Sequence, residues 1–174
     1  MDDRDRLVAI YLQDHLAGSV AALELVERAA RANAGNELGS FLTDLHGEIS
    51  ADKETLLATM RTLGVEPSRV KNAVAWTAEK AARLKANGGL LRYSPLSRVH
   101  ELEALEAGIV GKRSLWTNLQ AVDDSRLAGF DLPQLVERAE AQRAGVEEWR
   151  RRAAGALRPC EAPQSSGRPP GRDS

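Results

Sequence analysis

The sequence predicts an all-α protein in which four long amphipathic helices form a bundle, and three observations support this prediction. Apolar residues recur at spacings of three and four along four separate stretches, which is the pattern of a helix with one apolar face. Aromatic residues make up only 4% of the chain, so aliphatic side chains and alanine must fill the interior. The 174 residues are enough for one domain with a sizeable core.

The first two predicted helices are antiparallel neighbours. They span residues 4–31 and 37–63, and a short glycine-containing turn at residues 33–36 separates them. Gly64 and Pro67 end the second helix. Because the turn is so short, the two helices must lie side by side and run in opposite directions.

A long connection follows the second helix. Residues 68–85 predict a shorter helix, with Val70, Val74 and three alanines on its apolar side. An Asn-Gly-Gly sequence at residues 87–89 ends this element.

Two further long helices complete the predicted bundle. Ser94 caps the third helix and Pro95 occupies its first turn, and the apolar stripe continues to about Val122. Asp131 caps the fourth helix. Both assignments follow from residues that are favoured at helix starts.

The last residues of the chain differ in composition from the helices. Residues 158–174 are rich in Pro, Ser, Gly and Arg and cannot bury enough apolar surface to offset the entropy of ordering. We therefore expect a single helical domain over residues 1–157, followed by a disordered tail.

The lengths of the connections predict the directions of the helices. Short loops join the first helix to the second and the third to the fourth, whereas roughly 30 residues separate the second from the third. So long a connection can return along the bundle, which lets the third helix start at the same end as the second. The resulting up-down-down-up order is the ferritin-like arrangement. A plain up-down-up-down bundle, with the short helix as a fifth element, is the alternative.

Composition and charge exclude several classes of partner and location. The formal net charge is −1, from 24 basic and 25 acidic residues, so nothing favours nucleic acid or an anionic membrane as a partner. The N-terminus lacks the apolar stretch of a signal peptide, and no run approaches the roughly 20 apolar residues of a membrane span. The single cysteine, Cys160, fits a reducing compartment. We expect a cytoplasmic protein.

Three motifs carry a resemblance to a known superfamily. They are YLQDHLAG at residues 11–18, VAWTAEK at residues 74–80 and GIVGK at residues 108–112. Together they resemble a bacterial branch of the ferritin-like proteins that has no assigned activity. The resemblance covers roughly residues 5–157 and implies the fold more strongly than any function.

Polar residues interrupt the apolar stripes at one level of each long helix. They are His15 on the first helix, Asp52 with Glu48 one turn earlier on the second, Lys112 on the third, and Gln142 with Arg143 on the fourth. Counting back from the two short connections places His15 near the level of Asp52, and Lys112 opposite Gln142. The sequence therefore predicts a polar layer near the middle of the bundle.

The resemblance implies a di-metal site at this level. Ferritin-like enzymes place one Glu on each of two helices and a Glu-x-x-His on each of the other two. On that pattern His15 stands where the first-helix Glu belongs. Glu48 and Glu140 match two of the Glu positions, but Ala51 and Arg143 stand three residues later, where the histidines belong. Glu103 or Glu106 could serve on the third helix. No Glu-x-x-His occurs anywhere in the chain.

We therefore expect a metal-free layer in which Lys112 and Arg143 pair with carboxylates, because two cations oppose binding of a divalent ion. A second alternative is that one or more of these polar residues extend to solvent. The first alternative is a non-standard iron or manganese site. Its ligands would be His15, Glu48, Asp52, Glu106 and Glu140.

Three hypotheses of function follow. The leading one is a non-catalytic helical protein without a cofactor, acting by self-association or through a protein partner. The alternative is an atypical iron- or manganese-dependent oxidoreductase or metal-storage protein. The third is a binding protein for a small ligand, which requires a cavity at the polar layer.

Overall fold

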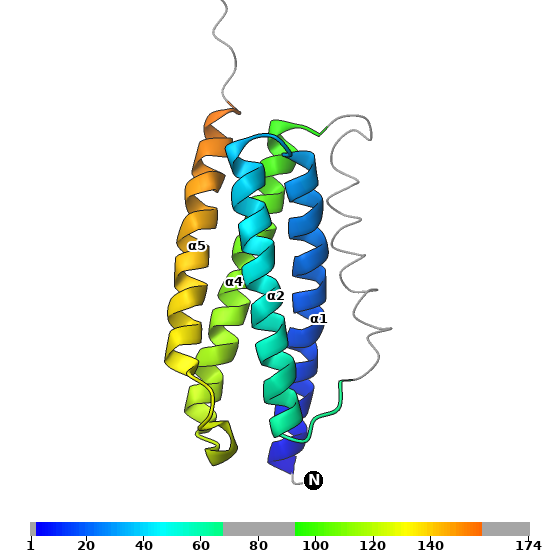
Figure 1. Cartoon of the computed structure of the whole chain (residues 1–174), viewed down its shortest axis with the longest axis vertical. Helices are drawn as coiled ribbons and strands as arrows, with labels where there is room; N and C mark the ends of the chain where they lie inside the picture. The colour runs from blue at the N-terminus through cyan, green and yellow to red at the C-terminus, as the bar shows by residue number, and fades with distance from the viewer. Residues whose placement is uncertain (1–2, 68–92, 158–174) are drawn as a thin grey trace, which may run out of the picture.

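The computed structural model describes residues 3–67 and 93–157, and within these ranges the chain is all-helical with no strand. The four long helices are α1 (Asp3–Ala32), α2 (Glu37–Thr62), α4 (Pro95–Val122) and α5 (Leu132–Gly155), and a short 3-10 helix, η1 (Ser125–Leu127), precedes α5. They lie side by side along one long axis (Figure 1). The all-α prediction is confirmed, and the helix bounds agree with the predicted ones to within about two residues. The predicted short helix and the predicted tail lie outside the described residues.

Local interactions explain where these helices begin. The side chain of Asn36 accepts a hydrogen bond from the Gly39 backbone N–H at 3.0 Å, which caps α2. A Cβ on Gly39 would lie 2.2 Å from the Asn33 carbonyl oxygen, so the tight turn from α1 to α2 requires glycine there. Ser94 and Asp131 accept the equivalent bonds at the starts of α4 and α5, as predicted.

The directions of the helices follow from contacts at their ends. Near the start of α4, Arg98 Nε donates to Asn33 Oδ1 at 2.9 Å, and Asn33 Nδ2 donates to Tyr93 Oη at 2.8 Å. Asn33 is buried at the end of α1. At the other end, Arg4 Nη2 donates to the Val122 carbonyl oxygen at 3.0 Å. α4 is therefore antiparallel to α1, and Figure 1 shows that α2 and α4 run in the same direction.

Two apolar blocks form the core. The first block surrounds Val26, Leu42, Leu102, Leu105 and Val146, and the second surrounds Leu12, Leu56, Met60, Trp116 and Leu119. α1 packs mainly against α2, and α4 mainly against α5, while α1 and α4 join the two pairs. None of the helices in the described ranges has an apolar stretch long enough to cross a membrane.

Candidate functional site

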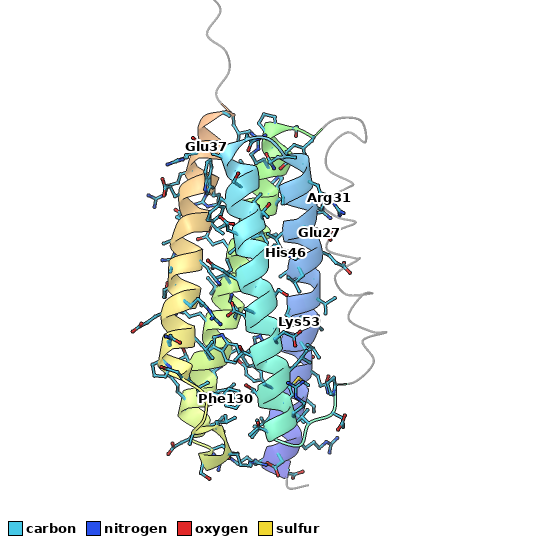
Figure 2. The ribbon with its side chains drawn as sticks, viewed as in Figure 1. Glu27, Arg31, Glu37, His46, Lys53 and Phe130 are labelled. Carbon is cyan, nitrogen blue, oxygen red and sulfur yellow. The ribbon has the colours of Figure 1, made fainter. Side chains whose placement is uncertain are left out.

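A group of charged and amide side chains lies where the two apolar blocks meet. It consists of Glu48 and Asp52 from α2, Lys112 from α4, and Arg138 and Gln142 from α5, and we call it the central ion cluster. Lys53, labelled in Figure 2, follows Asp52 in α2 and marks the height of the cluster along the helix. Each helix has an apolar stripe that faces the core. The cluster arises because polar residues stand at positions of these stripes, while the stripe residues one turn away are apolar.

Most polar atoms of the central ion cluster find partners within it, but the buried Nε of Arg138 has none among the described residues. Lys112 Nζ donates to Asp52 Oδ2 and to Gln142 Oε1, while Arg138 Nη2 donates to Asp52 Oδ1. Gln142 Nε2 donates to Glu48 Oε2 at 2.9 Å and to Asp52 Oδ2 at 3.3 Å. Two acids and two bases balance, so the cluster carries no net charge. A buried charge that is paired and hydrogen-bonded in this way can persist inside a protein.

Burial nevertheless perturbs the cluster. It lowers the pKa of the Lys112 ammonium below its ordinary range, and the neighbouring Asp52 carboxylate only partly opposes that shift. Lys112 is thus held in place at a cost in desolvation that its ion pair does not fully offset.

The structure does not bring Glu106, Glu140 and Arg143 to the central ion cluster. Arg143 Nε instead donates to Glu140 Oε2 at 3.0 Å, and Arg143 lies 3.8 Å from a Glu106 oxygen. Successive residues of a helix point about 100° apart, so only one of the two adjacent residues Gln142 and Arg143 faces inward. That residue is Gln142.

These outward residues belong to a second group, which we call the surface ladder. It links α4 to α5 and comprises Glu106, Arg113, Glu140, Arg143, Glu147 and Arg150. Each of its pairs is at least partly open to solvent, so the predicted single layer is in fact two separate groups.

His15 lies apart from both groups. Its ring meets the Tyr11 ring edge-on, with the centroids 4.5 Å apart and the planes at 77°. Burial lowers the pKa of His15, and the nearby Asp14 carboxylate opposes that shift. An imidazole in this setting favours its neutral form.

The arrangement does not fit a di-metal centre. In the ranges that the structure describes, no three His, Cys, Asp or Glu side chains gather closely enough to hold a metal ion. Both oxygens of Asp52 already accept hydrogen bonds from cations, and Glu106 and Glu140 pair with arginines. The five predicted ligands are therefore dispersed among the cluster, the ladder and the Tyr11 contact.

A cleft of about 540 Å³ lies between α1 and α4 and reaches Asp52 and Lys112 of the central ion cluster; we call it the α1–α4 cleft. Small residues open it. They are Gly18, Ala21 and Ala22 on α1, and Ala104, Ala107, Gly108 and Gly111 on α4. Among the residues that the structure describes, a Cβ added at Gly18, Gly108 or Gly111 would meet no atom within 4 Å.

Sequence reasoning missed the α1–α4 cleft and Arg138. Ala104, Ala107, Gly108 and Gly111 recur at spacings of three and four, which is a small-residue stripe that could have indicated an open interface. Arg138 stands one turn before Gln142 and shares its face of α5, which could have placed it in the cluster.

Comparisons with known proteins supply no relative from which a role could be inferred. No family model matches the sequence, and neither the curated proteins nor the solved structures include a significant match. The function must therefore be argued from the residues themselves.

Proposed function

We propose that this chain is a non-catalytic helical bundle of the ferritin-like type that acts by binding, with the α1–α4 cleft as its binding site. The helix directions support the ferritin-like assignment, because α1 and α5 run one way, α2 and α4 run the other, and the long connection falls between α2 and α4.

The central ion cluster supports a non-catalytic role. General acid–base or nucleophilic catalysis needs a group with a free lone pair or proton within reach of a substrate. Both oxygens of Asp52 accept hydrogen bonds from cations within the cluster, so this carboxylate is not a free base, and Lys112 stays ion-paired with it. The cluster is better suited to holding three helices together than to transforming a substrate.

The α1–α4 cleft is the single observation that carries the binding proposal. Ligand sites of small molecules enclose about 300–1,000 Å³ and have mainly apolar walls with a few polar groups. The cleft has this size, walls of Gly, Ala, Leu and Ile, and a polar end at His15, Asp52 and Lys112. The small-ligand hypothesis from the sequence needs a cavity at the polar layer, and the cleft supports that hypothesis. We therefore place a small, largely apolar ligand there.

A matched pair of glycine variants tests this function. Gly108→Leu fills the α1–α4 cleft, whereas Gly47→Leu changes a residue of α2 that does not line it, and a Cβ there would meet no atom of the described residues within 4 Å. Both replace a helical glycine by leucine, so both gain the same helix propensity. Titration with the uncharged dye N-phenyl-1-naphthylamine should show saturable fluorescence enhancement for the unaltered protein and for Gly47→Leu, but not for Gly108→Leu.

Two outcomes would contradict the proposal. One is an unaltered protein that does not bind the dye, and the other is a pair of variants that bind it equally well. Self-association and a protein partner, both expected from the sequence, stay predictions. Sedimentation equilibrium of the purified chain tests self-association, and a single species with the mass of one chain would contradict it.

A further inference from the structure

His15 lies on the side of α1 that faces α4 and the α1–α4 cleft. Tyr11 stands one helical turn before His15, so the two side chains share one face of α1. The Tyr11 hydroxyl accepts a hydrogen bond from Asn118 Nδ2 of α4 at 2.8 Å, which directs this face toward α4. The His15 ring packs edge-on against the Tyr11 ring, and His15 lines the cleft. The imidazole is therefore part of the cleft wall.

The wall around His15 is mainly apolar. Gly18 and Ala22 follow it in the lining on α1, and Leu115 lines the cleft from α4. His15 is half-buried there, and burial lowers the pKa of its imidazole from the ordinary value of 6.5. A molecule in the cleft would remove further water from the ring. Because the charged form loses more hydration free energy than the neutral form, such a molecule would oppose protonation further.

Charged side chains of three helices share this lining. In the described part of the chain they come from α1, α2 and α4, and they are Asp14, Glu24, Arg28, Asp52, Lys53 and Lys112. Lys112 is paired with Asp52. The charge that opposes desolvation of the His15 ring is that of Asp14, and Asp14 is exposed, so water screens it. The surroundings of the ring therefore compensate a proton on it only weakly.

We propose that protons regulate the α1–α4 cleft through His15, so that the cleft binds its ligand while this imidazole is neutral and releases it when the imidazole is protonated. This regulation rests on the proposed binding function and deepens it. The coupling is mutual, because a ligand whose binding is weakened by a proton must weaken binding of that proton by the same factor.

The sign of the pH dependence follows from the direction of the pKa shift. Ligand binding lowers the pKa of His15 below that of the ligand-free ring, which is itself below 6.5. Affinity is therefore full at neutral pH, where the ring is neutral in both states. It falls as the pH drops through the pKa of the ligand-free ring, and it levels off once the ring is protonated in the bound state as well.

Fluorescence titration with N-phenyl-1-naphthylamine at about pH 7.5 and about pH 5 tests the regulation. The diarylamine nitrogen of this dye stays unprotonated over the range, so the dye itself carries no charge. The dissociation constant should rise roughly fivefold at the lower pH. Circular dichroism at both pH values verifies that the helices are intact.

Two histidine variants assign the effect. His15→Phe keeps an aromatic ring in the wall but cannot take up a proton, so its dissociation constant should be the same at both pH values. His46→Phe is the matched control. His46 is also half-buried, on α2 (Figure 2), but it does not line the cleft, so this variant should keep the full pH dependence.

A second readout measures the coupling from the side of the proton. With ¹³C-labelled histidine, the Cε1–H resonance of His15 reports its protonation and is identified by its absence from His15→Phe. Saturating dye should lower the pKa of His15 and leave the titration of His46 unchanged. The factor by which the dye weakens proton binding should equal the factor by which the proton weakens dye binding.

The outcomes separate the regulation from the binding function. Equal affinity of the unaltered protein at the two pH values would overturn the regulation and leave the cleft as a binding site. A pH dependence that persists in His15→Phe would assign it to another group and would overturn the role of His15. Failure of the dye to bind at neutral pH would overturn the proposed function itself.

Discussion

The central ion cluster and the surface ladder contain the same kinds of ion pair at different depths. The side chains of Asp52 and Lys112 are 4% and 15% exposed, whereas the side chain of Arg143 is 39% exposed. Water screens the outer pairs and leaves them little net energy, while the inner pairs interact strongly but lose their hydration. The contribution of an ion pair to the stability of the fold therefore depends on how deeply it is buried, and not on how many pairs surround it.

The pKa directions show the same contrast. Burial lowers the pKa of Lys112 even though Asp52 lies against it. In the ladder, the hydrogen bond to Glu140 raises the pKa of Arg143, and desolvation is a lesser influence. Desolvation dominates at Lys112 and pairing dominates at Arg143, so equivalent mutations at these two positions should have unequal effects.

The largest effect is expected from Lys112→Met. This change removes one of the two cationic partners of a buried carboxylate and should lower the free energy of unfolding by roughly 3–5 kcal/mol. Urea unfolding followed by circular dichroism measures it. A loss below about 0.5 kcal/mol would mean that Lys112 reaches solvent and that the cluster behaves like the ladder.

Removing both partners should cost less than the two single changes together. In the double variant Asp52→Leu with Lys112→Met, no unpaired carboxylate is left at position 52, and Arg138 is 35% exposed and can turn toward water. We expect the double variant to be at least about 2 kcal/mol more stable than the sum of the single losses predicts. Strict additivity in a double-mutant cycle would contradict a coupled cluster.

A smaller loss is expected from Gln142→Leu. The change keeps the approximate shape of the side chain but removes the acceptor for Lys112 and the donor to Glu48, which should cost about 1–2 kcal/mol. Gln134→Leu is the control, because Gln134 is exposed and its backbone N–H, which the substitution keeps, donates to the cap Asp131. Equal stability of the two variants would mean that the amide is dispensable.

The free energy of unfolding should depend on pH through the imidazole of His15. Folding lowers the pKa of this ring by burial, so the unfolded chain binds more protons below about pH 6.5. The free energy of unfolding should therefore fall as the pH drops from about 7 to about 5.5. His15→Phe should flatten that part of the profile. A wild-type profile that is already flat there would show that the imidazole is not desolvated.

The smallest effect is expected from Arg143→Met. The side chain is half-open to water and its pairs belong to the surface ladder, so the urea midpoint should stay unchanged within measurement error. Added salt should also leave the difference from wild type near zero. A loss comparable to that of Lys112→Met would erase the distinction between the two groups.

The sequence predicted the helices and the inward residues of the central ion cluster better than it predicted the position of Arg143 or the α1–α4 cleft. Asp52, Lys112 and Gln142 each replace an apolar residue in a stripe, and periodicity alone places such residues inward. Gln142 and Arg143 stand three and four residues after Ala139, and both spacings fit an apolar stripe, so the stripe alone did not choose between them. The α1–α4 cleft depends on how far apart two helices settle, which small residues permit but spacing does not determine.

The central ion cluster also fixes how the helices slide past one another. Leucine-rich stripes pack almost as well after a shift of one turn, about 5.4 Å, because apolar contacts are not directional. Such a shift of α4 would bring Gly108 or Trp116 opposite Asp52 and would bury Lys112 among apolar side chains. The charges therefore single out one axial register of α2, α4 and α5, which the apolar core alone would leave open.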